Sequence, residues 1–236
     1  MDYKNVKILV VGVGGLGCPA SLALVDSGVG TLGLMDFDRV EISNLHRQIL
    51  YGDHDLGRPK VEAAVDCFKS RYPEVRIVPI QDKMSSENLQ SLIPEYDLVI
   101  DGLDRLEKKF FLNDWCVKLG KPYVHAGVVK LEGQVLAVAP GQTACLRCLL
   151  PKIPPPFAMP TCQEAGVLGA FSQTIGYLQA HEALRLARKM GPYRLWKVDA
   201  GKRISRSIIP DRNPNCSACG RGKMETLNDD ACAIPG

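Results

Sequence analysis

The sequence predicts an α/β protein built around a doubly wound sheet. Over residues 1–140, apolar runs rich in β-branched residues alternate with helical patterns, which is typical of βαβ units around parallel strands. A glycine-rich turn lies between the first predicted strand and the first predicted helix. The chain has 236 residues, of which 46% are hydrophobic, so we expect one large domain with a sizeable core rather than two.

The elements follow in order along the chain. Predicted strands cover residues 7–11, 31–36, 76–79, 98–101 and 122–126, and predicted helices cover residues 17–27, 59–71, 86–93 and 105–119. Pro59 is predicted in the first turn of its helix, where its missing N–H costs nothing. A strand at 134–139, a Pro-rich loop at 151–160 and a helix at 165–189 come next. Strands at 194–199 and 203–209 then form a hairpin before a polar tail.

Composition and charge exclude several classes of protein. The formal net charge is +3, and the 29 Lys and Arg residues are spread along the chain, which is too mild a bias to predict nucleic-acid binding. No apolar stretch approaches the roughly 20 residues that a membrane span needs, and the first strand begins at residue 7, which leaves no room for a signal peptide. We therefore expect a cytoplasmic protein. The 9 cysteines include two C-x-x-C pairs, and in a reducing compartment they favour metal or thiol chemistry over disulfides.

The glycine-rich turn predicts a nucleotide site. Gly12, Gly14, Gly15 and Gly17 fit the pattern G-x-G-x-x-G, where bare backbone can approach a phosphate and the helix N-terminus presents free N–H groups. Asp36 ends the next predicted strand, where a carboxylate can accept hydrogen bonds from a ribose. The alternative is that the glycines serve only a tight turn and close helix packing. The order of these elements, a strand, the glycine loop, a helix, a second strand and then Asp36, is typical of dinucleotide-binding folds and favours nucleotide binding.

The segment after Asp36 is more specific. The run DFDRVEISNLHRQ at residues 36–48, followed by GRPK at 57–60, resembles the ThiF/MoeB/HesA family and the ubiquitin-activating enzymes, and the likeness extends over roughly residues 7–219. The resemblance implies that ATP is bound by Asp36, Asp38, Asn44, Arg47 and Lys60. Arg47 and Lys60 would also stabilise charge on the phosphates during the reaction. The alternative for both cations is an exposed position in a weak surface pair.

Asp104 follows the fourth predicted strand, at the carboxyl edge where doubly wound sheets bind ligands. The resemblance implies that Asp104 holds Mg²⁺ against the phosphates; the alternative is a helix N-cap, and an Asp can do both. Family members commonly have Asn and Arg where this chain has Arg105 and Lys109, so added positive charge is expected beside the phosphate site. Members usually also carry an N-terminal arginine that reaches the partner's ATP site. Here residues 1–6 alone precede the first strand, so either another cation, Arg105 or Lys109, substitutes or the nucleotide site is weaker than in other members.

Two cysteine pairs predict a metal site. Cys145 with Cys148 and Cys216 with Cys219 have the C-x-x-C spacing that brings two thiolates to one tetrahedral ion; redox or inert thiols are the alternatives. The resemblance implies a structural Zn²⁺ that ties the crossover segment to the C-terminal region. Four thiolates leave no open position for catalysis. The full fold prediction is a doubly wound, Rossmann-like mixed sheet with a C-terminal antiparallel extension and a structural zinc site.

Cys162 lies between the Pro-rich loop and the last predicted helix. The dipole of a helix N-terminus favours a thiolate, and family members carry a cysteine at this motif that in some takes part in persulfide or thioester chemistry. Cys162 is therefore a candidate catalytic thiol, with a small buried residue as the alternative. Cys18, Cys67 and Cys116 lie in helical patterns and are predicted to be core residues.

The resemblance implies an ATP-dependent adenylyltransferase. It would activate the terminal glycine carboxylate of a ubiquitin-like sulfur-carrier protein ending in Gly-Gly and release pyrophosphate, for thiamin, molybdopterin or related biosynthesis. The implied cofactors are ATP, Mg²⁺ and Zn²⁺. The implied partners are the carrier, a sulfur donor protein and a second copy of the chain in a homodimer.

Three alternatives stay open from the sequence. They are an NAD-dependent oxidoreductase, a tRNA-modifying relative that activates a carboxylate on a modified adenosine, and an inactive subunit of a heterodimeric activating enzyme. In every case we expect one domain over residues 1–236. It would comprise a nucleotide-binding part at 1–140, a part with the crossover loop, zinc site and carrier contacts at 141–222, and a flexible tail at 223–236.

Overall fold

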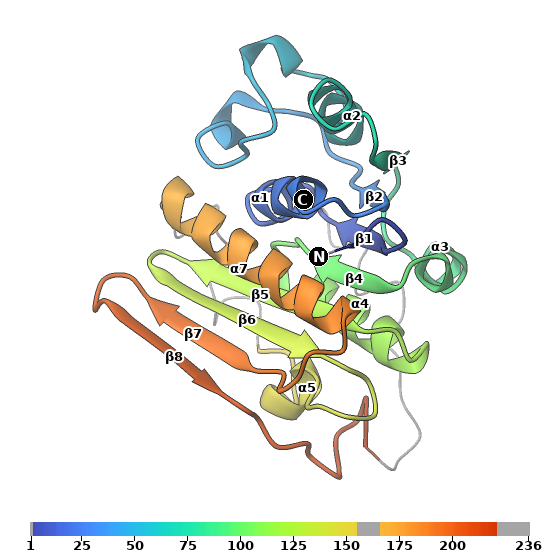
Figure 1. The fold of residues 1–236 in the computed structure, drawn as a ribbon. Coiled ribbons are helices and arrows are strands. Elements are labelled where there is room, and N and C mark those ends of the chain that lie inside the picture. Colours follow the sequence, from blue (N-terminus) through green and yellow to red (C-terminus); the bar gives the residue numbers. More distant parts are fainter. Residues whose placement is uncertain (1, 155–165, 221–236) are drawn as a thin grey trace.

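The computed structural model describes residues 2–154 and 166–220, which form an α/β fold around one 8-stranded sheet (Figure 1). The strands are β1 (Lys7–Val11), β2 (Thr31–Met35), β3 (Arg76–Ile80), β4 (Leu98–Asp101), β5 (Tyr123–Val129), β6 (Glu132–Val138), β7 (Leu195–Asp199) and β8 (Ile204–Ile208). The α-helices are α1 (Gly17–Asp26), α2 (Lys60–Lys69), α3 (Ser86–Leu92), α4 (Leu106–Lys118), α5 (Leu146–Leu149) and α7 (Gly169–Ala187). Short 3-10 helices are η1 (Ile42–Asn44), η2 (Asp53–Asp55) and η3 (Ile93–Glu95).

The strand order is β3-β2-β1-β4-β5-β6-β7-β8, and the pairs from β3 to β5 are parallel. Strands β1 and β4 are therefore neighbours although β2 and β3 lie between them in the chain. Val11 at the end of β1 is in register with Asp101 at the end of β4. The loops that follow these two strands meet at the point where the strand order reverses, which is where open α/β sheets bind ligands.

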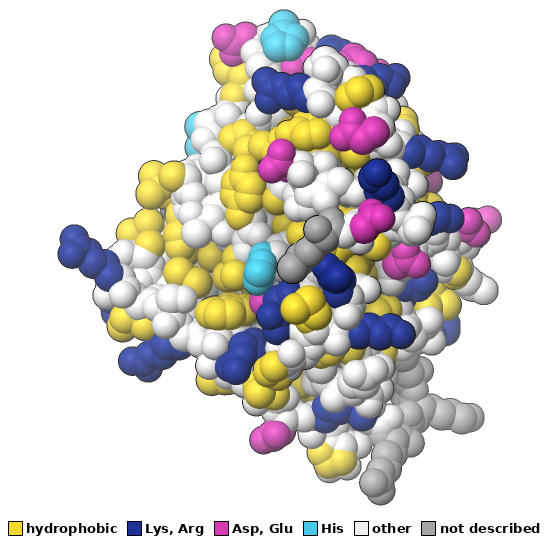
Figure 2. Space-filling model, in the orientation of Figure 1, with side chains coloured by type: hydrophobic (Ala, Val, Ile, Leu, Met, Phe, Trp, Pro, Cys, Tyr) yellow, Lys and Arg dark blue, Asp and Glu magenta, His cyan; other side chains and the backbone are white. Residues whose placement is uncertain are grey.

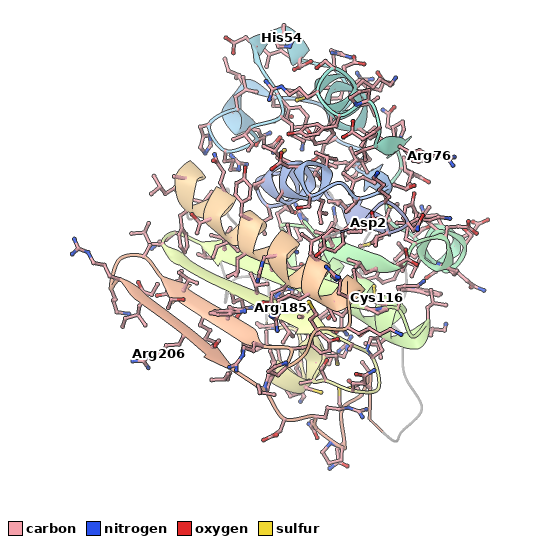
Figure 3. All side chains as sticks on the ribbon, in the orientation of Figure 1. Asp2, His54, Arg76, Cys116, Arg185 and Arg206 are labelled. Atoms are coloured by element: carbon pink, nitrogen blue, oxygen red, sulfur yellow. The ribbon has the colours of Figure 1, made fainter. Side chains whose placement is uncertain are left out.

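The sheet continues with antiparallel strands. Strand β6 pairs with β5 over seven positions, from Tyr123 opposite Val138 to Val129 opposite Glu132, and β7 and β8 follow antiparallel. Strand β8 forms the edge, and Arg206 projects from it away from the sheet (Figure 3). The predicted mixed sheet with a C-terminal antiparallel extension is confirmed.

Two apolar layers cover the two faces of the sheet. Because side chains alternate along a strand, Ile8 and Val10 face one layer while Leu9 and Val11 face the other. Residues of α1, α2 and α7 pack in the first layer, and residues of α3, α4 and α5 pack in the second. Figure 1 shows α7 running across the face that α1 also covers.

Three predictions on the elements were wrong in detail. Pro59 is the residue before the first helical residue of α2, with φ −55° and ψ 132°, and is not in the first turn. Helix α7 begins at Gly169 rather than at residue 165. Gly166 adopts a left-handed φ of 72°, which a right-handed helix cannot contain, so the helix starts after it. Cys67 was predicted in the core but is only partly buried, and it packs against the edge of the first apolar layer. Cys18 and Cys116 are fully buried as predicted.

Within the described ranges, no helix is both long and apolar enough to cross a membrane. On the face seen in Figure 2, Lys and Arg side chains are spread over the surface with Asp and Glu side chains among them. Cys162 and the tail at 223–236 lie outside the described residues, so their predicted properties stay predictions.

Candidate active site

Two of the predicted loop glycines are required by the fold itself. Gly12 has a φ of +89°, and a Cβ atom there would lie 2.7 Å from the carbonyl oxygen of Gly102 in the neighbouring loop. A Cβ on Gly17 would collide with the carbonyl of Gly12. Glycine at position 12 lets the loops after β1 and β4 touch, and glycine at position 17 lets the start of α1 pack against the glycine loop itself. For Gly12 and Gly17, therefore, close packing alone explains the residue.

The other two glycines lie beside polar side chains. A Cβ on Gly14 would meet only the side-chain amide of Gln48, at 3.6 Å, whereas a Cβ on Gly15 would lie 3.0 Å from Oγ of Ser172 and 3.4 Å from Cδ of Arg47. The backbone N–H groups of Gly14, Gly15 and Leu16 donate to no other group in residues 2–154 and 166–220. These free donors precede helix α1, which is the arrangement that binds phosphate.

Gln48 supports the same interpretation. Its side chain is 3% exposed, and its carbonyl oxygen Oε1 is buried without a hydrogen-bond partner among the described residues. Buried polar atoms in folded proteins are almost always paired, so an unpaired oxygen beside the glycine loop fits a site completed by a ligand or by water. Gln48 belongs to the segment that follows η1, and its side chain packs beside Gly14 of the glycine loop.

Asp36 directly follows β2 and is fixed to the glycine loop. Its Oδ2 accepts a hydrogen bond from the N–H of Val13 at 2.7 Å, and its Oδ1 accepts one from the N–H of Asp38 at 2.9 Å. Burial raises the pKa of Asp36, against the opposing effect of the Lys60 charge. A carboxylate oxygen offers more than one acceptor direction, so Asp36 can still receive a hydroxyl donor.

Lys60 points inward rather than into solvent. Its side chain is 5% exposed, and Nζ lies 2.9 Å from Oδ2 of Asp38, which is 48% exposed. Although burial acts to lower it, the charges of Asp36 and Asp38 raise the pKa of Lys60. Lys60 is therefore a buried cation held between two carboxylates close to the glycine loop, and the alternative of an exposed surface pair was wrong.

Arg47 is held in place by its own 3-10 turn. One guanidinium nitrogen donates to Oδ1 of Asn44 at 2.6 Å, and the other donates to the carbonyl of Ser43 at 3.2 Å. No carboxylate within 4 Å pairs with Arg47 among the described residues. The guanidinium is thus oriented and retains an unneutralised charge beside Gly15. The structure brings Asp36, Asp38, Asn44, Arg47 and Lys60 around one loop.

Asp104 lies in the turn between β4 and α4, next to the glycine loop. The N-cap of α4 is Arg105 and no side chain caps the helix, so the alternative of an Asp104 N-cap was wrong. The carboxylate of Asp104 is exposed and bonded to no described residue. An exposed, unpaired carboxylate at the switch point is a suitable oxygen ligand for a hard cation.

Lys109 does not add charge to the phosphate site, contrary to the prediction. Its side chain is buried, and Nζ lies 3.0 Å from Oδ1 of Asp101 beneath the turn. The ammonium is therefore neutralised inside the protein and cannot act as a substitute cation for ATP. Arg105 is only partly buried and has no ion-pair partner in the described part of the chain, so it stays available at the loop.

The two C-x-x-C pairs come together in space. The distances between sulfur atoms are 4.0 Å for Cys145 and Cys148, 3.6 Å for Cys145 and Cys216, and 3.3 Å for Cys148 and Cys219. All four ligand atoms lie within 4.8 Å of one another. Four sulfurs bound to tetrahedral Zn²⁺ at about 2.3 Å stand about 3.8 Å apart, so the cluster fits that ion. Burial raises the pKa of Cys145, which an ion would offset.

A polar network joins the cysteine cluster to helix α4. Arg147, inside the first C-x-x-C, makes two hydrogen bonds of 2.7 Å to the carboxylate of Asp114. Oδ1 of Asn113 accepts from the N–H of Leu146 at 2.9 Å and from the hydroxyl of Tyr123 at 2.5 Å. The turn that carries Cys145 and Cys148 is thereby fastened to α4, whose other end adjoins Asp104.

Three residues near the loop were missed by sequence reasoning. The hydroxyl of Tyr51 donates to the carbonyl of Val13 at 2.9 Å, and the hydroxyl of Ser172 in α7 donates to the carbonyl of Gly15 at 2.8 Å. Gln48 is the last residue of the run at residues 36–48, so the sequence could have indicated that it lies at the site. Tyr51 and Ser172 belong to no motif, and only the packing of α7 against α1 brings Ser172 to the loop.

A pocket of about 560 Å³ lies elsewhere, between the segment at residues 49–58 and helix α2. Its lining includes Tyr51, His54, Arg58, Asp66 and Cys67, and Figure 3 shows His54 at the outer end of this region. Arg58 is already paired with Asp66 at 2.5 Å and with a second carboxylate. The pocket does not reach the glycine loop, so we place the candidate site at the loop.

The fold and the site define an α/β protein with a glycine-loop anion cradle at the switch point and a cluster of four cysteines. A family model described as the ThiF family matches residues 2–218. The chain therefore belongs to the ThiF family, as the resemblance in its sequence predicted.

Two relatives and one solved structure set the likeness in context. The sulfur carrier protein adenylyltransferase of Thermus thermophilus is 40% identical over 225 residues, which are 92% of this chain and 83% of that protein. Adenylyltransferase and sulfurtransferase MOCS3-1 of Drosophila pseudoobscura pseudoobscura is 41% identical over 96% of this chain, which spans 51% of that protein, or about half its length. The structure of E. coli MccB with MccA-N7isoASN has a TM-score of 0.81 at 24% identity, over 93% of this chain and 68% of that one. At that identity the likeness shows the fold alone.

Proposed function

We propose that this chain is an ATP-dependent adenylyltransferase that activates the C-terminal glycine carboxylate of a ubiquitin-like sulfur carrier. The observation that carries the proposal is the convergence of Asp36, Asn44, Arg47 and Lys60 on one glycine loop in a chain of the ThiF family. Similarity to a sulfur carrier protein adenylyltransferase over 83% of that protein's length supports this substrate class.

The residues around the loop suit the parts of ATP. The free N–H groups of Gly14 and Gly15 fit phosphate oxygens, and Asp36, with Asp38 beside it, fits the ribose hydroxyls. Arg47, oriented by Asn44, brings a positive charge to the phosphates. Lys60, already paired with Asp38, would contribute charge from beneath the loop rather than as a mobile ligand.

The chemistry needs positioning and charge stabilisation, because the attacking group belongs to the carrier. A carboxylate oxygen of the carrier's last glycine attacks the α-phosphorus, the bond to the bridging oxygen of the β-phosphate breaks, and pyrophosphate leaves with the electron pair. Arg47 and the loop N–H groups are preplaced to stabilise the extra negative charge of the transition state. Asp104 would hold Mg²⁺, which neutralises the leaving pyrophosphate when it is bound.

The four cysteines would hold one structural Zn²⁺. Cys145, Cys148, Cys216 and Cys219 supply four thiolates at spacings close to those of a tetrahedral site, so no position is left for substrate. Because the ligands come from two distant segments, the ion would fasten residues 213–220 to the turn at 145–148. Its contribution is to the fold and to the placement of α4, not to the reaction itself.

Two partners are part of this proposal. The acyl adenylate is a reactive mixed anhydride, so a sulfur donor protein is proposed to displace AMP. Cys162 is the proposed thiol for that stage and lies outside the described residues. A homodimer and a cytoplasmic location are proposed as well, and Arg105 is the available cation if a second cation is needed near Asp104.

Trapping of the adenylate tests the function. The protein is incubated with Mg-ATP, hydroxylamine and a carrier that ends in Gly-Gly, and the carrier is analysed by intact-mass spectrometry. A carrier hydroxamate formed only with ATP is expected. A carrier whose terminal carboxylate is amidated is the matched control and should stay unmodified. If none of a panel of such carriers yields a hydroxamate while ATP is bound, the proposed substrate class is wrong.

A further inference from the structure

The carboxylate of Asp101, at the end of β4, is fully buried and bonded at both oxygens. Oδ1 accepts from Nζ of Lys109 at 3.0 Å and from the N–H of Leu103 at 3.1 Å, and Oδ2 lies 2.7 Å from Nδ1 of His125. Burial acts to raise the pKa of Asp101, but the charge of Lys109 and the hydrogen bond from His125 outweigh it and lower that pKa. Asp101 is thus a fixed anion directly beneath the switch point.

Lys109 connects the first turn of α4 to two strands. Besides its ion pair with Asp101, Nζ donates to the carbonyl of Ala126 in β5 at 2.6 Å. Burial lowers the pKa of His125, so its ring is neutral and Nδ1–H is the donor to Asp101. Lys109 therefore holds the start of the helix against the carboxyl ends of β4 and β5.

The turn that carries Asp104 spans the gap between these fixed points. At one end Gly102 donates its N–H to strand β1 at 2.8 Å, and Leu103 donates its N–H to Asp101. At the other end the helix begins and is anchored through Lys109. Because no described residue bonds the carboxylate of Asp104, only the backbone of this short turn sets its position.

We propose that Lys109, through its buried ion pair with Asp101, is a positioning residue that holds the turn so that Asp104 meets the divalent cation on the ATP phosphates. The inference rests on the role of Asp104 in the proposed function and deepens it. Lys109 contacts no substrate in this account. Its charge is paired inside the protein with the carboxylate of Asp101, which also accepts a hydrogen bond from the turn.

A metal-binding measurement separates positioning from simple electrostatics. Mn²⁺ replaces Mg²⁺ and is titrated, with α,β-methylene-ATP present, into the wild type, Lys109→Met and Lys109→Arg, and free Mn²⁺ is measured by electron paramagnetic resonance. Positioning predicts about tenfold weaker Mn²⁺ binding in Lys109→Met and recovery of most of that loss in Lys109→Arg. Lys118→Met removes a cation from the far end of α4 and is the control, which should bind Mn²⁺ as the wild type does.

The direction of the change in Mn²⁺ affinity distinguishes a positioning role of Lys109 from a purely electrostatic one. If Lys109 acted only through its charge, removing a cation would strengthen the binding of another cation, so tighter Mn²⁺ binding in Lys109→Met overturns the proposal. Lys109→Met leaves Asp101 as an unpaired buried charge and threatens folding. The double variant Asp101→Asn with Lys109→Met removes both charges and nearly preserves the shapes; weaker binding there supports positioning, and unchanged binding overturns it.

Two assays test the positioning role of Lys109 and the proposed function separately. Mn²⁺ binding requires only the nucleotide analogue and decides the positioning role of Lys109. Carrier-dependent chemistry decides the proposed substrate. In the same variants, the Mg²⁺ concentration for half-maximal pyrophosphate exchange should rise while the KM for the carrier stays unchanged. A general structural defect would instead lower kcat without that shift.

Discussion

Arg147 forms a two-point salt bridge with Asp114, with both hydrogen bonds 2.7 Å long and both side chains buried. Arg147 lies between Cys145 and Cys148, and Asp114 lies in α4, so the pair joins the cysteine cluster to the helix that begins beside Asp104. The hydrogen bonds to Asp114 raise the pKa of Arg147.

Breaking this pair should destabilise the fold. Arg147→Met leaves the carboxylate of Asp114 buried and uncompensated, and the free energy of unfolding should fall by about 3–5 kcal/mol. Urea denaturation monitored by circular dichroism measures the loss. Arg206→Met removes an exposed arginine from β8 and should change stability by no more than about 0.5 kcal/mol. Equal stabilities of the two variants would contradict a structural role for the pair.

The loop glycines should separate into two groups. Gly12→Ala forces a left-handed residue against the carbonyl of Gly102 and should cost about 1–3 kcal/mol of unfolding free energy. Gly14→Ala meets only the amide of Gln48 at 3.6 Å, so the fold should keep its stability. Its methyl group stands at the cradle and should weaken ATP binding, measured by calorimetry. Unweakened ATP binding by a folded Gly14→Ala protein would remove the loop from the site.

The purified protein should contain about one Zn²⁺ per chain, measured by elemental analysis of protein prepared without chelator. Cys216→Ser should lose the ion and lower the Tm by roughly 5–10 °C, because the metal links segments that are distant in sequence. Cys67→Ser, at a thiol outside the cluster, is the matched control and should keep both metal and Tm. Zinc-free wild-type protein of full stability would rule the metal site out.

Cys162→Ser should retain carrier-dependent pyrophosphate exchange, because adenylation uses the carrier's own carboxylate and needs no protein nucleophile. Any loss should appear only when sulfur transfer to the carrier is assayed. Iodoacetamide should modify Cys162 faster than Cys18, since burial raises the pKa of Cys18 to about 12. If Cys162→Ser lost exchange with ATP binding intact, the thiol would belong to the first step of the reaction.

The strands at the switch point could be predicted from the sequence with their bounds. Lys7–Val11 and Leu98–Asp101 are short apolar runs that end at a glycine or an aspartate, and buried parallel strands have that pattern. The start of α7 could not, because residues before Gly169 fit a helical pattern but Gly166 takes a left-handed conformation. Helix propensity predicts that a helix forms in this segment, whereas tertiary contacts decide at which residue the helix begins.

The same limit applies to the site. The resemblance to the ThiF/MoeB/HesA family implied Asp36, Asn44, Arg47 and Lys60 together, because all four belong to the quoted runs at residues 36–48 and 57–60. It did not predict that Lys109 turns inward, since its partners, the carboxylate of Asp101 and the carbonyl of Ala126, come from two different strands that only the folded sheet brings together. Residues that act through tertiary ion pairs carry no local signal in the sequence.

Carrier-dependent exchange of labelled pyrophosphate into ATP reports the first chemical step and its reversal, so it shows whether this protein adenylates a carrier. The wild type should catalyse exchange only when a carrier ending in Gly-Gly is present. Arg47→Ala and Asp104→Ala should each lower the rate by about 10²- to 10³-fold while their circular dichroism spectra match the wild type. Exchange that needs no carrier, or near wild-type rates in both variants, would contradict the account.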